Sequence, residues 1–329
     1  MQRSGSIMLI ISCILGSAIL INCGRNNTRQ ANSIPGIKLI REGDHSVKVM
    51  IDGKHFTSYT LSSDNEKPIF FPVNSPRGNM INRGYPGIEG LPDERQDHPH
   101  HQSLWFTYGD VNSVDFWNEP RDPKRNGKIV PTGLTIIEEE NVSGIVAHAN
   151  WVMPDEWVVL KEEKKVVFHK KENYRALDFT IKLTAQDSLA YFGDTKEGMF
   201  GIRVTPSLKD DNEGQYINSD SLIGNEACWG KRAAWVALQG PVKDEAVTLA
   251  IFNHPQSINY PCYWHARGYG LFSANPFGRK AYTRGAQEPL ELTLEPGKSI
   301  VFKARVMVYS GKMTKAELDQ EFEAYKAGR

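Results

Sequence analysis

Alternation of apolar and polar residues over short runs constrains this chain most. Polar residues alternate with Leu177, Phe179, Ile181 and Leu183. This pattern predicts a strand with one buried and one solvent-exposed face. Similar short runs, bounded by turn residues, recur along most of the chain. We predict strands at residues 46–51, 56–61, 68–73, 134–139, 144–153, 156–161, 164–169, 176–183, 233–238, 246–252, 269–273, 290–294 and 299–308.

Two local signals support this pattern. Asp52-Gly53 between the first two runs predicts a tight hairpin turn. Helical periodicity is convincing only near the end, where Thr314 and Glu317 form a capping-box pattern. Runs of strands without interleaved helices are typical of sandwiches and barrels. We therefore expect an all-β protein: a single large antiparallel β-sandwich over residues 36–329, with a C-terminal α-helix.

The first residues resemble an export signal. Arg3 precedes an apolar stretch that ends in Leu20-Ile21-Asn22-Cys23, which is similar to a bacterial lipobox. We expect residues 1–22 to be a lipoprotein signal peptide, Cys23 to carry the lipid, and polar residues 23–35 to be a flexible tether. The alternative is an uncleaved anchor helix, although the apolar run is shorter than the ~20 residues that span a bilayer. The expected location is the bacterial cell envelope, periplasmic or at the outer membrane, with membrane contact only through the lipid.

Charge and cysteine content restrict the partners. The formal net charge is zero and no basic run is present, which argues against nucleic acid as a partner. In the part of the chain expected to fold, Cys228 and Cys262 are the only cysteines. Export permits one disulfide between them, but two buried free thiols fit as well, because a chain with 40% hydrophobic residues does not need a covalent link.

A histidine cluster is the first candidate site. His98, His100 and His101 lie within four positions, just before an apolar, aromatic segment. In an extended backbone, His98 and His100 would share one face and His101 would point to the other. Imidazoles exchange protons near neutral pH, so we predict acid/base work or substrate contact for these residues. The alternatives are a divalent metal ion held by His98 and His100, and a structural role at a strand end.

Charged residues of the middle segment form a second candidate. Lys196 and Glu197 are bracketed by Gly193 and Gly198, which predicts a loop or bulge that directs one of the charges into a pocket. Glu197 is the predicted general base, and Lys196 or Arg203 would orient a hydroxyl or carboxylate. A solvated surface turn with an ion pair is the alternative.

A third candidate mixes a flat apolar ring with fixed donors. Trp264, His265 and Arg267 lie close together in the sequence, and stacking plus bidentate polar contact is what a sugar site needs. His254 is a further candidate for substrate contact. The alternative is a core tryptophan beside a surface arginine.

Four blocks of the sequence, taken together, resemble a known family. HPHHQSLWFTYGDVNSVDFW, DTKEGMFGIRV, NHP and YWHARGYGLFSANPFG are similar to the signature blocks of bacterial proteins catalogued as PmoA-related or methane oxygenase PmoA-like, formally a domain of unknown function. The match spans nearly the whole mature chain. The resemblance implies a galactose-mutarotase-like β-supersandwich and an association with sugar catabolism.

Three functions remain open from the sequence. The first is a carbohydrate-acting enzyme, of epimerase, hydrolase or lyase type, that uses His/Glu acid-base chemistry on a sugar or oligosaccharide and has no cofactor. The second is a non-catalytic glycan-binding module. The third is a metal enzyme in which His98 and His100 share an ion with His254 or His265.

Overall fold

The structure is a computed structural model that describes residues 1–2, 34–64, 66–117 and 125–329. Residues 3–22 of the predicted signal peptide, Cys23 and all but the last two residues of the predicted tether lie outside the described residues. Asn32–Arg329 form one compact unit, to which the following description refers.

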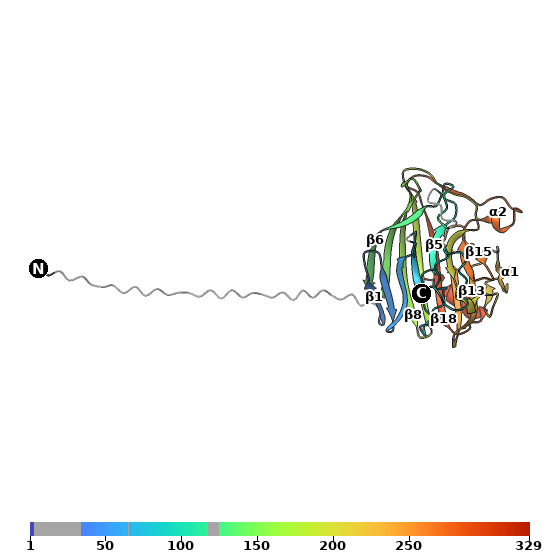
Figure 1. The fold of residues 1–329 in the computed structure, drawn as a ribbon, viewed down its shortest axis with the longest axis horizontal. Helices are drawn as coiled ribbons and strands as arrows, with labels where there is room; N and C mark the ends of the chain where they lie inside the picture. The colour runs from blue at the N-terminus through green and yellow to red at the C-terminus, as the bar shows by residue number, and fades with distance from the viewer. Residues whose placement is uncertain (3–33, 65, 118–124) are drawn as a thin grey trace. The chain divides into compact units, whose positions relative to one another are not determined.

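Two antiparallel sheets face each other and make up most of this unit (Figure 1). The first sheet contains, in spatial order, β1 (Ile37–Arg41), β2 (Val47–Ile51), β3 (Lys54–Leu61), β4 (Pro68–Val73), β5 (Leu104–Tyr108), β11 (Gly198–Arg203), β16 (Leu271–Asn275) and β15 (Tyr263–Ala266). The second contains β12 (Gln215–Asn218), β13 (Trp235–Val242), β14 (Glu245–Asn253), β18 (Ser299–Ser310), β9 (Tyr174–Ala185), β8 (Val158–Lys171), β7 (Val142–Val152) and β6 (Lys128–Glu139). A small extra sheet pairs β10 (Ala190–Phe192) with β17 (Leu292–Leu294). The helical elements are η1 (Pro206–Leu208), α1 (Asn225–Cys228), α2 (Arg279–Tyr282) and α3 (Lys315–Lys326).

The main core lies between the two sheets. Alternate residues of each strand enter it, among them Phe106, Phe200 and Trp264 from the first sheet and Phe179 and Phe302 from the second. The prediction of an antiparallel β-sandwich with a C-terminal helix is confirmed.

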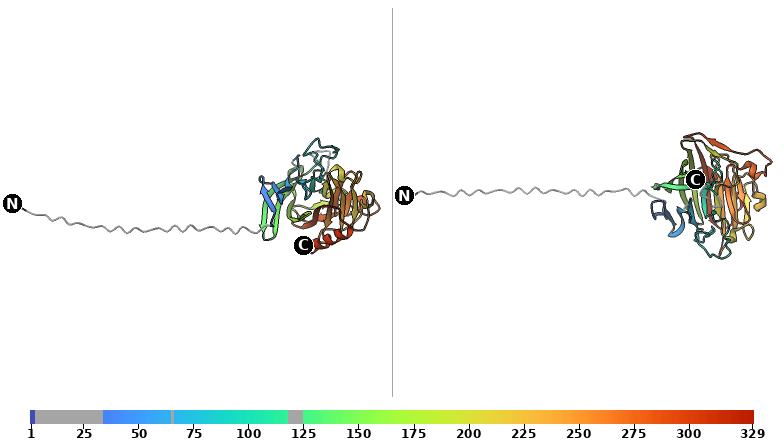
Figure 2. Two further views of the ribbon diagram at one scale, coloured as in Figure 1. Left: turned by 90° about the horizontal axis from the view of Figure 1, so that it is seen from below. Right: turned by 45° about the horizontal axis from the view of Figure 1, so that its top comes forward.

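Local predictions hold at both ends of the unit. Asp52 and Gly53 join β2 to β3, and both adopt positive φ angles (50° and 76°), as the mirror-image hairpin turn requires. Thr314 caps α3 through the predicted capping box with Glu317. The helix buries Leu318, Phe322 and Tyr325 against the outer face of the second sheet, and its red ribbon is visible in Figure 2.

One strand prediction is wrong. Residues 156–161 and 164–169 are predicted as two strands, but the structure has a single long strand there, β8 (Val158–Lys171). The charged run between them does not make a turn, because its alternate residues Glu162 and Lys164 point inward as a buried ion pair of 2.8 Å. The indole N–H of Trp151 donates to the other carboxylate oxygen of Glu162, at 3.0 Å.

Cys228 and Cys262 are both buried and unbridged. In the described part of the chain, no helix has the length and apolar character needed to cross a membrane.

Candidate functional site

The three clustered histidines form a tight turn before β5. His98 has a positive φ of 44°, and the backbone N–H of His101 donates to the carbonyl of His98 at 2.9 Å. The turn brings the imidazoles together: His98 stacks on His101 with centroids 5.0 Å apart, and His100 meets His101 edge-on at 4.2 Å. The prediction of an extended segment with His101 on the opposite face is therefore wrong.

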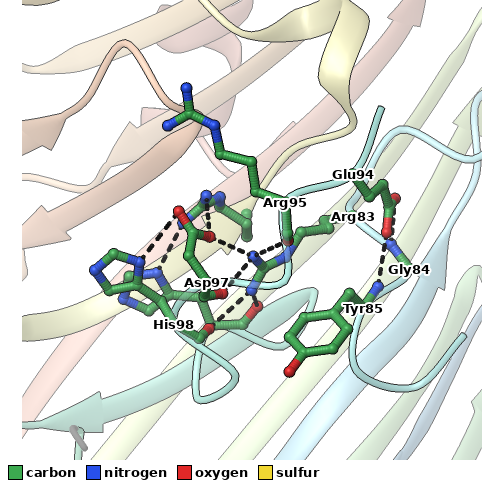
Figure 3. A network of polar contacts seen from close by, with 9 residues as sticks. Arg83, Gly84, Tyr85, Glu94, Arg95, Asp97 and His98 are labelled. Atoms are coloured by element: carbon green, nitrogen blue, oxygen red, sulfur yellow. Dashed lines mark hydrogen bonds and ion pairs between the residues drawn. The ribbon is translucent and has the colours of Figure 1, made fainter. Parts of the chain in front are cut away.

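Arg83 lies at the centre of the hydrogen-bond network of this turn (Figure 3). Its buried guanidinium donates to the carbonyls of Arg95, Asp97, His98 and His101, at 2.7 to 3.1 Å. It also donates to the carboxylate of Asp97. A single side chain thus satisfies four backbone carbonyls of an irregular loop, which fixes the loop's path.

Arg203, at the end of β11, completes the network. Its fully buried guanidinium donates to Asp97 at 2.8 Å and lies 3.2 Å from Nδ1 of His101. Burial would raise the pKa of Asp97, but the charges of Arg203 and Arg83 outweigh burial and lower it. Arg203 was predicted to contact substrate; its position is that of a residue that orients Asp97 and His101.

The three histidines differ in how deeply their side chains are buried. Burial, assisted by the charge of Lys67, lowers the pKa of His100 to about 2, and burial together with neighbouring His100 and Arg203 keeps that of His101 well below its usual value. Both residues are therefore neutral at pH 7. Only the His98 side chain is substantially exposed, at 45%, with its Nδ1 3.4 Å from the carboxylate of Asp97. His98 is thus the member of the cluster that a ligand can reach.

The outer face of the first sheet continues this site. Trp105, Gly201, Ser273 and His265 are direct neighbours across β5, β11, β16 and β15, so their side-chain positions share one face. A Cβ atom on Gly201 would lie 3.0 Å from the ring of Trp105 and 3.1 Å from that of Trp117. Glycine therefore allows both indoles to lie on the sheet at this point.

Glu197 and His265 meet on this face. Glu197 Oε2 lies 4.0 Å from Nδ1 of His265, and Lys196 forms an ion pair with the other carboxylate oxygen. The buried Nδ1 of His265 has no hydrogen-bond partner among the described residues. Burial and the charges of Lys196 and Arg267 lower the pKa of His265 to about 3, so the imidazole is neutral at pH 7.

Tyr269, in the turn between β15 and β16, connects the histidine cluster to the third predicted segment. His98 stacks on its ring with centroids 5.6 Å apart and planes 4° from parallel. The guanidinium carbons of Arg203 and Arg267 lie 4.5 Å and 5.5 Å from the centroid of the same ring. Sequence reasoning missed Tyr269, although it is two residues beyond the predicted Arg267.

A pocket of about 640 Å³ opens beside Tyr269. It is lined by aromatic, basic and acidic residues: Asp211, Asn225, Glu226, Trp229, Ala266, Arg267, Gly268, Tyr269 and Arg284. Trp229 connects the pocket to the Glu197–His265 pair, because its ring centroid is 6.5 Å from that of His265. Trp229 was not predicted from the sequence.

Two predicted site residues lie elsewhere. Trp264 is fully buried in the core between the sheets and donates its indole N–H to the carbonyl of Ala233, so it cannot stack on a ligand. His254 follows β14 of the second sheet and packs edge-on against Tyr325 of α3 at 5.0 Å. The prediction that Trp264 contacts substrate is therefore wrong, whereas His254 lies on the second sheet, apart from the other candidates.

The metal alternative named His254 or His265 as a third ligand, and His254 lies on the second sheet. Among the described residues, no group of three or more His, Cys, Asp or Glu side chains is arranged to hold a metal ion. His98 and His100 remain neighbours, with ring centroids 5.7 Å apart.

Comparison with known proteins places the chain in a family. A model of a family of unknown function, DUF6807, matches residues 46–323. The chain belongs to this family. No curated protein matches it in sequence. The resemblance to PmoA-related proteins stays a prediction from the sequence blocks.

Three solved structures are among those similar to the chain. A galactose mutarotase related enzyme from Lactobacillus acidophilus is 13% identical with a TM-score of 0.35, and the match covers 84% of this chain and 100% of that one. The Slr1438 protein from Synechocystis sp. PCC 6803 is 11% identical with a TM-score of 0.38, covering 85% and 98%. The galactosidase domain of an alpha-galactosidase-sucrose kinase is 8% identical with a TM-score of 0.43, and the match covers 83% of this chain but 42% of that one. The likeness concerns the fold, and a TM-score below 0.5 says nothing about shared activity.

Proposed function

We propose that this protein binds a sugar or sugar derivative at the outer face of the first sheet and converts it by acid-base chemistry. The observation that carries the proposal is the 4.0 Å approach of the Glu197 carboxylate to the unpartnered Nδ1 of His265. A ligand hydroxyl at this pair would donate its single proton to Glu197, because the Glu197 side chain is 18% exposed and that of His265 only 3%. Glu197 is the proposed proton acceptor, since the environment that lowers the pKa of His265 disfavours a protonated imidazole there.

The surroundings of the pair favour a sugar. Trp229 and Tyr269 offer flat apolar rings to the C–H faces of a pyranose, while Arg267 and Asn225 offer polar contacts to its rim. His98 is the proposed proton donor, because it is exposed, stacked on Tyr269 and held near the carboxylate of Asp97. His100 and His101 position it rather than exchange protons.

Proton NMR of a panel of pyranoses and disaccharides in D2O tests the proposal. The spectra report anomer interconversion, bond cleavage and exchange of carbon-bound protons in one measurement. On the sugar that reacts, Glu197→Gln should reduce the rate by a factor of about 10² or more, as loss of a general base does. Glu295→Gln, at an exposed glutamate in the turn after β17, is the matched control and should keep the wild-type rate.

Three outcomes would count against it. Wild-type turnover by Glu197→Gln removes this residue as the base. Binding of sugars without any turnover makes the protein a glycan-binding module, and absence of both binding and turnover across the panel overturns the proposal.

We also propose that the protein is anchored in the cell envelope by a lipid on Cys23. The support is the lipobox-like Leu20-Ile21-Asn22-Cys23 after an apolar stretch. Mass spectrometry of the mature N-terminus should find a diacylglyceryl group on Cys23, and Cys23→Ser should release the protein from the membrane fraction. An unmodified, uncleaved N-terminus would contradict this proposal.

A further inference from the structure

The pocket beside Tyr269 contains two arginines whose charges no described carboxylate neutralises. Arg267 and Arg284 both line the pocket, and neither forms an ion pair within the described part of the chain. Each guanidinium lies on an aromatic ring instead: Arg267 is 5.5 Å from the centroid of Tyr269, and Arg284 is 5.5 Å from that of Trp229. A guanidinium that lies on a ring can still direct N–H groups to a ligand.

The acidic residues of the pocket are placed differently. The carboxylate of Asp211 lies so close to Gly268 that a Cβ atom there would be only 1.8 Å from its oxygen. Asp211 also donates its backbone N–H to the Gly268 carbonyl, so it is tied to the pocket wall. Glu226 is exposed on α1. These carboxylates can accept hydrogen bonds from hydroxyl groups, while the two arginines remain for an anion.

From this arrangement we infer that the ligand of the pocket is an anionic sugar, whose carboxylate or equivalent group binds between Arg267 and Arg284 while its ring packs on Trp229 and Tyr269. The inference rests on the proposed function, since it names the substrate class of the same site. The guanidinium fork accepts a planar carboxylate through two parallel hydrogen bonds.

The charge of Arg267 also acts on the proposed catalytic pair. Besides burial, its proximity lowers the pKa of Lys196 and contributes to the low pKa of His265. An anion bound to Arg267 offsets this positive potential where protons are exchanged. Charge recognition in the pocket and proton transfer at Glu197 are thereby coupled.

Calorimetric titration of the full chain with D-glucuronate and D-galacturonate, each compared with its uncharged C6 amide, tests the inference. The amides keep the size and the hydroxyl groups but lack the charge. We expect at least one uronate to bind about 10-fold or more tightly than its amide, and the preference to fall as NaCl is raised. Arg267→Gln and Arg284→Gln should each reduce the preference by a similar factor, whereas Lys312→Gln, at an exposed lysine outside the pocket, should not.

The outcomes separate this inference from the proposed function. Equal binding of uronate and amide, or an unchanged preference in both arginine variants, overturns the anionic class while leaving proton exchange at Glu197 intact. A uronate preference that depends on the arginines, combined with wild-type turnover in Glu197→Gln, supports the inference and contradicts the catalytic assignment. Absence of binding by every uronate and amide overturns the anionic class, and turnover of a neutral sugar that depends on Glu197 would then leave the proposed function standing.

Discussion

The imidazole of His98 stacks on the ring of Tyr269, with centroids 5.6 Å apart and planes 4° from parallel. The two residues come from distant parts of the chain: the turn before β5 and the turn between β15 and β16. Their contact joins the histidine cluster to the pocket. It also places the one exposed histidine of the cluster beside a ring that lines the pocket.

Removing the Tyr269 ring should change the environment of His98. In Tyr269→Ala, the Hε1 resonance of His98 should move by several tenths of a ppm, because the ring current of the stacked phenol is lost. Tyr269→Phe keeps the ring and should leave the resonance nearly in place. An unchanged His98 resonance in Tyr269→Ala would mean that the stack does not form in solution.

Replacing Arg83 should loosen the whole histidine turn. Arg83→Met leaves the carbonyls of Arg95, Asp97, His98 and His101 without their common donor and the Asp97 carboxylate with one guanidinium fewer. We expect the free energy of unfolding to fall by about 3–5 kcal/mol, as when one partner of a buried ion pair is removed. Urea denaturation measures the loss, and amide hydrogen exchange should increase over residues 95–101.

Arg95 offers the matched control for that experiment. Its side chain points away from the network in Figure 3, and only its backbone carbonyl takes part. Arg95→Gln removes the same charge nearby and should change the unfolding free energy by about 0.5 kcal/mol or less. Equal losses in the two variants would show that charge alone, and not the donor set of Arg83, stabilises the turn.

Asp178 should make the free energy of unfolding depend on pH in the acidic range. Burial would raise the pKa of this carboxyl, but hydrogen bonds from Arg305 and His169 outweigh burial and lower it. A carboxyl with a lowered folded-state pKa contributes stability above its unfolded pKa of about 3.9, and that contribution is lost as the pH falls through the folded pKa. Wild-type stability should therefore fall below about pH 4.

The variant Asp178→Asn should lose this part of the acid dependence and be less stable at pH 7 by about 3–5 kcal/mol, since Arg305 then remains buried without its partner. Urea denaturation at a series of pH values measures both effects. Asp187→Asn, at an exposed aspartate, should behave as wild type. A pH dependence in Asp178→Asn identical to that of wild type would assign the effect to other carboxyls.

Trp264 should contribute mainly to stability, and Trp229 mainly to ligand binding. Trp264→Ala opens a cavity in the core and should cost about 3–5 kcal/mol of stability. Trp229→Ala removes a half-buried pocket wall, so it should weaken ligand binding about 10-fold or more while costing less stability. Thermal denaturation and titration with the best-binding sugar distinguish the two. Loss of binding in a folded Trp264→Phe variant with Trp229→Ala unaffected would reverse the assignment.

Alternation of apolar and polar residues is visible in the local sequence, so it predicted most of the strands and, from their number, the sandwich. It also placed the β2–β3 hairpin and α3, where a turn dipeptide and a capping box act within a few residues. It did not predict β8 as one strand, since nothing local marks Glu162 and Lys164 as an inward-facing pair. Here the tertiary environment decides.

The site was predicted only in part, because residue types can be read from the sequence and tertiary contacts cannot. Reactive residue types drew attention to His98, Glu197, His265 and Arg267, which all lie around one face of the first sheet. Arg83 and Tyr269 were missed, because their importance comes from contacts with residues far away in the sequence. Trp264 was misjudged because the strand register, which sends its side chain inward, cannot be read from composition.

The pleat of β11 ties the chemistry to correct assembly. Phe200 and Ile202 enter the core, while Gly201 and Arg203 lie on the opposite face, beneath the two indoles and beside Asp97. A slip of one residue would force a bulky side chain under the tryptophans and drive a guanidinium into the hydrocarbon interior. Closure of the sandwich at β11 therefore also sets the positions of Gly201 and Arg203 on the candidate site's face.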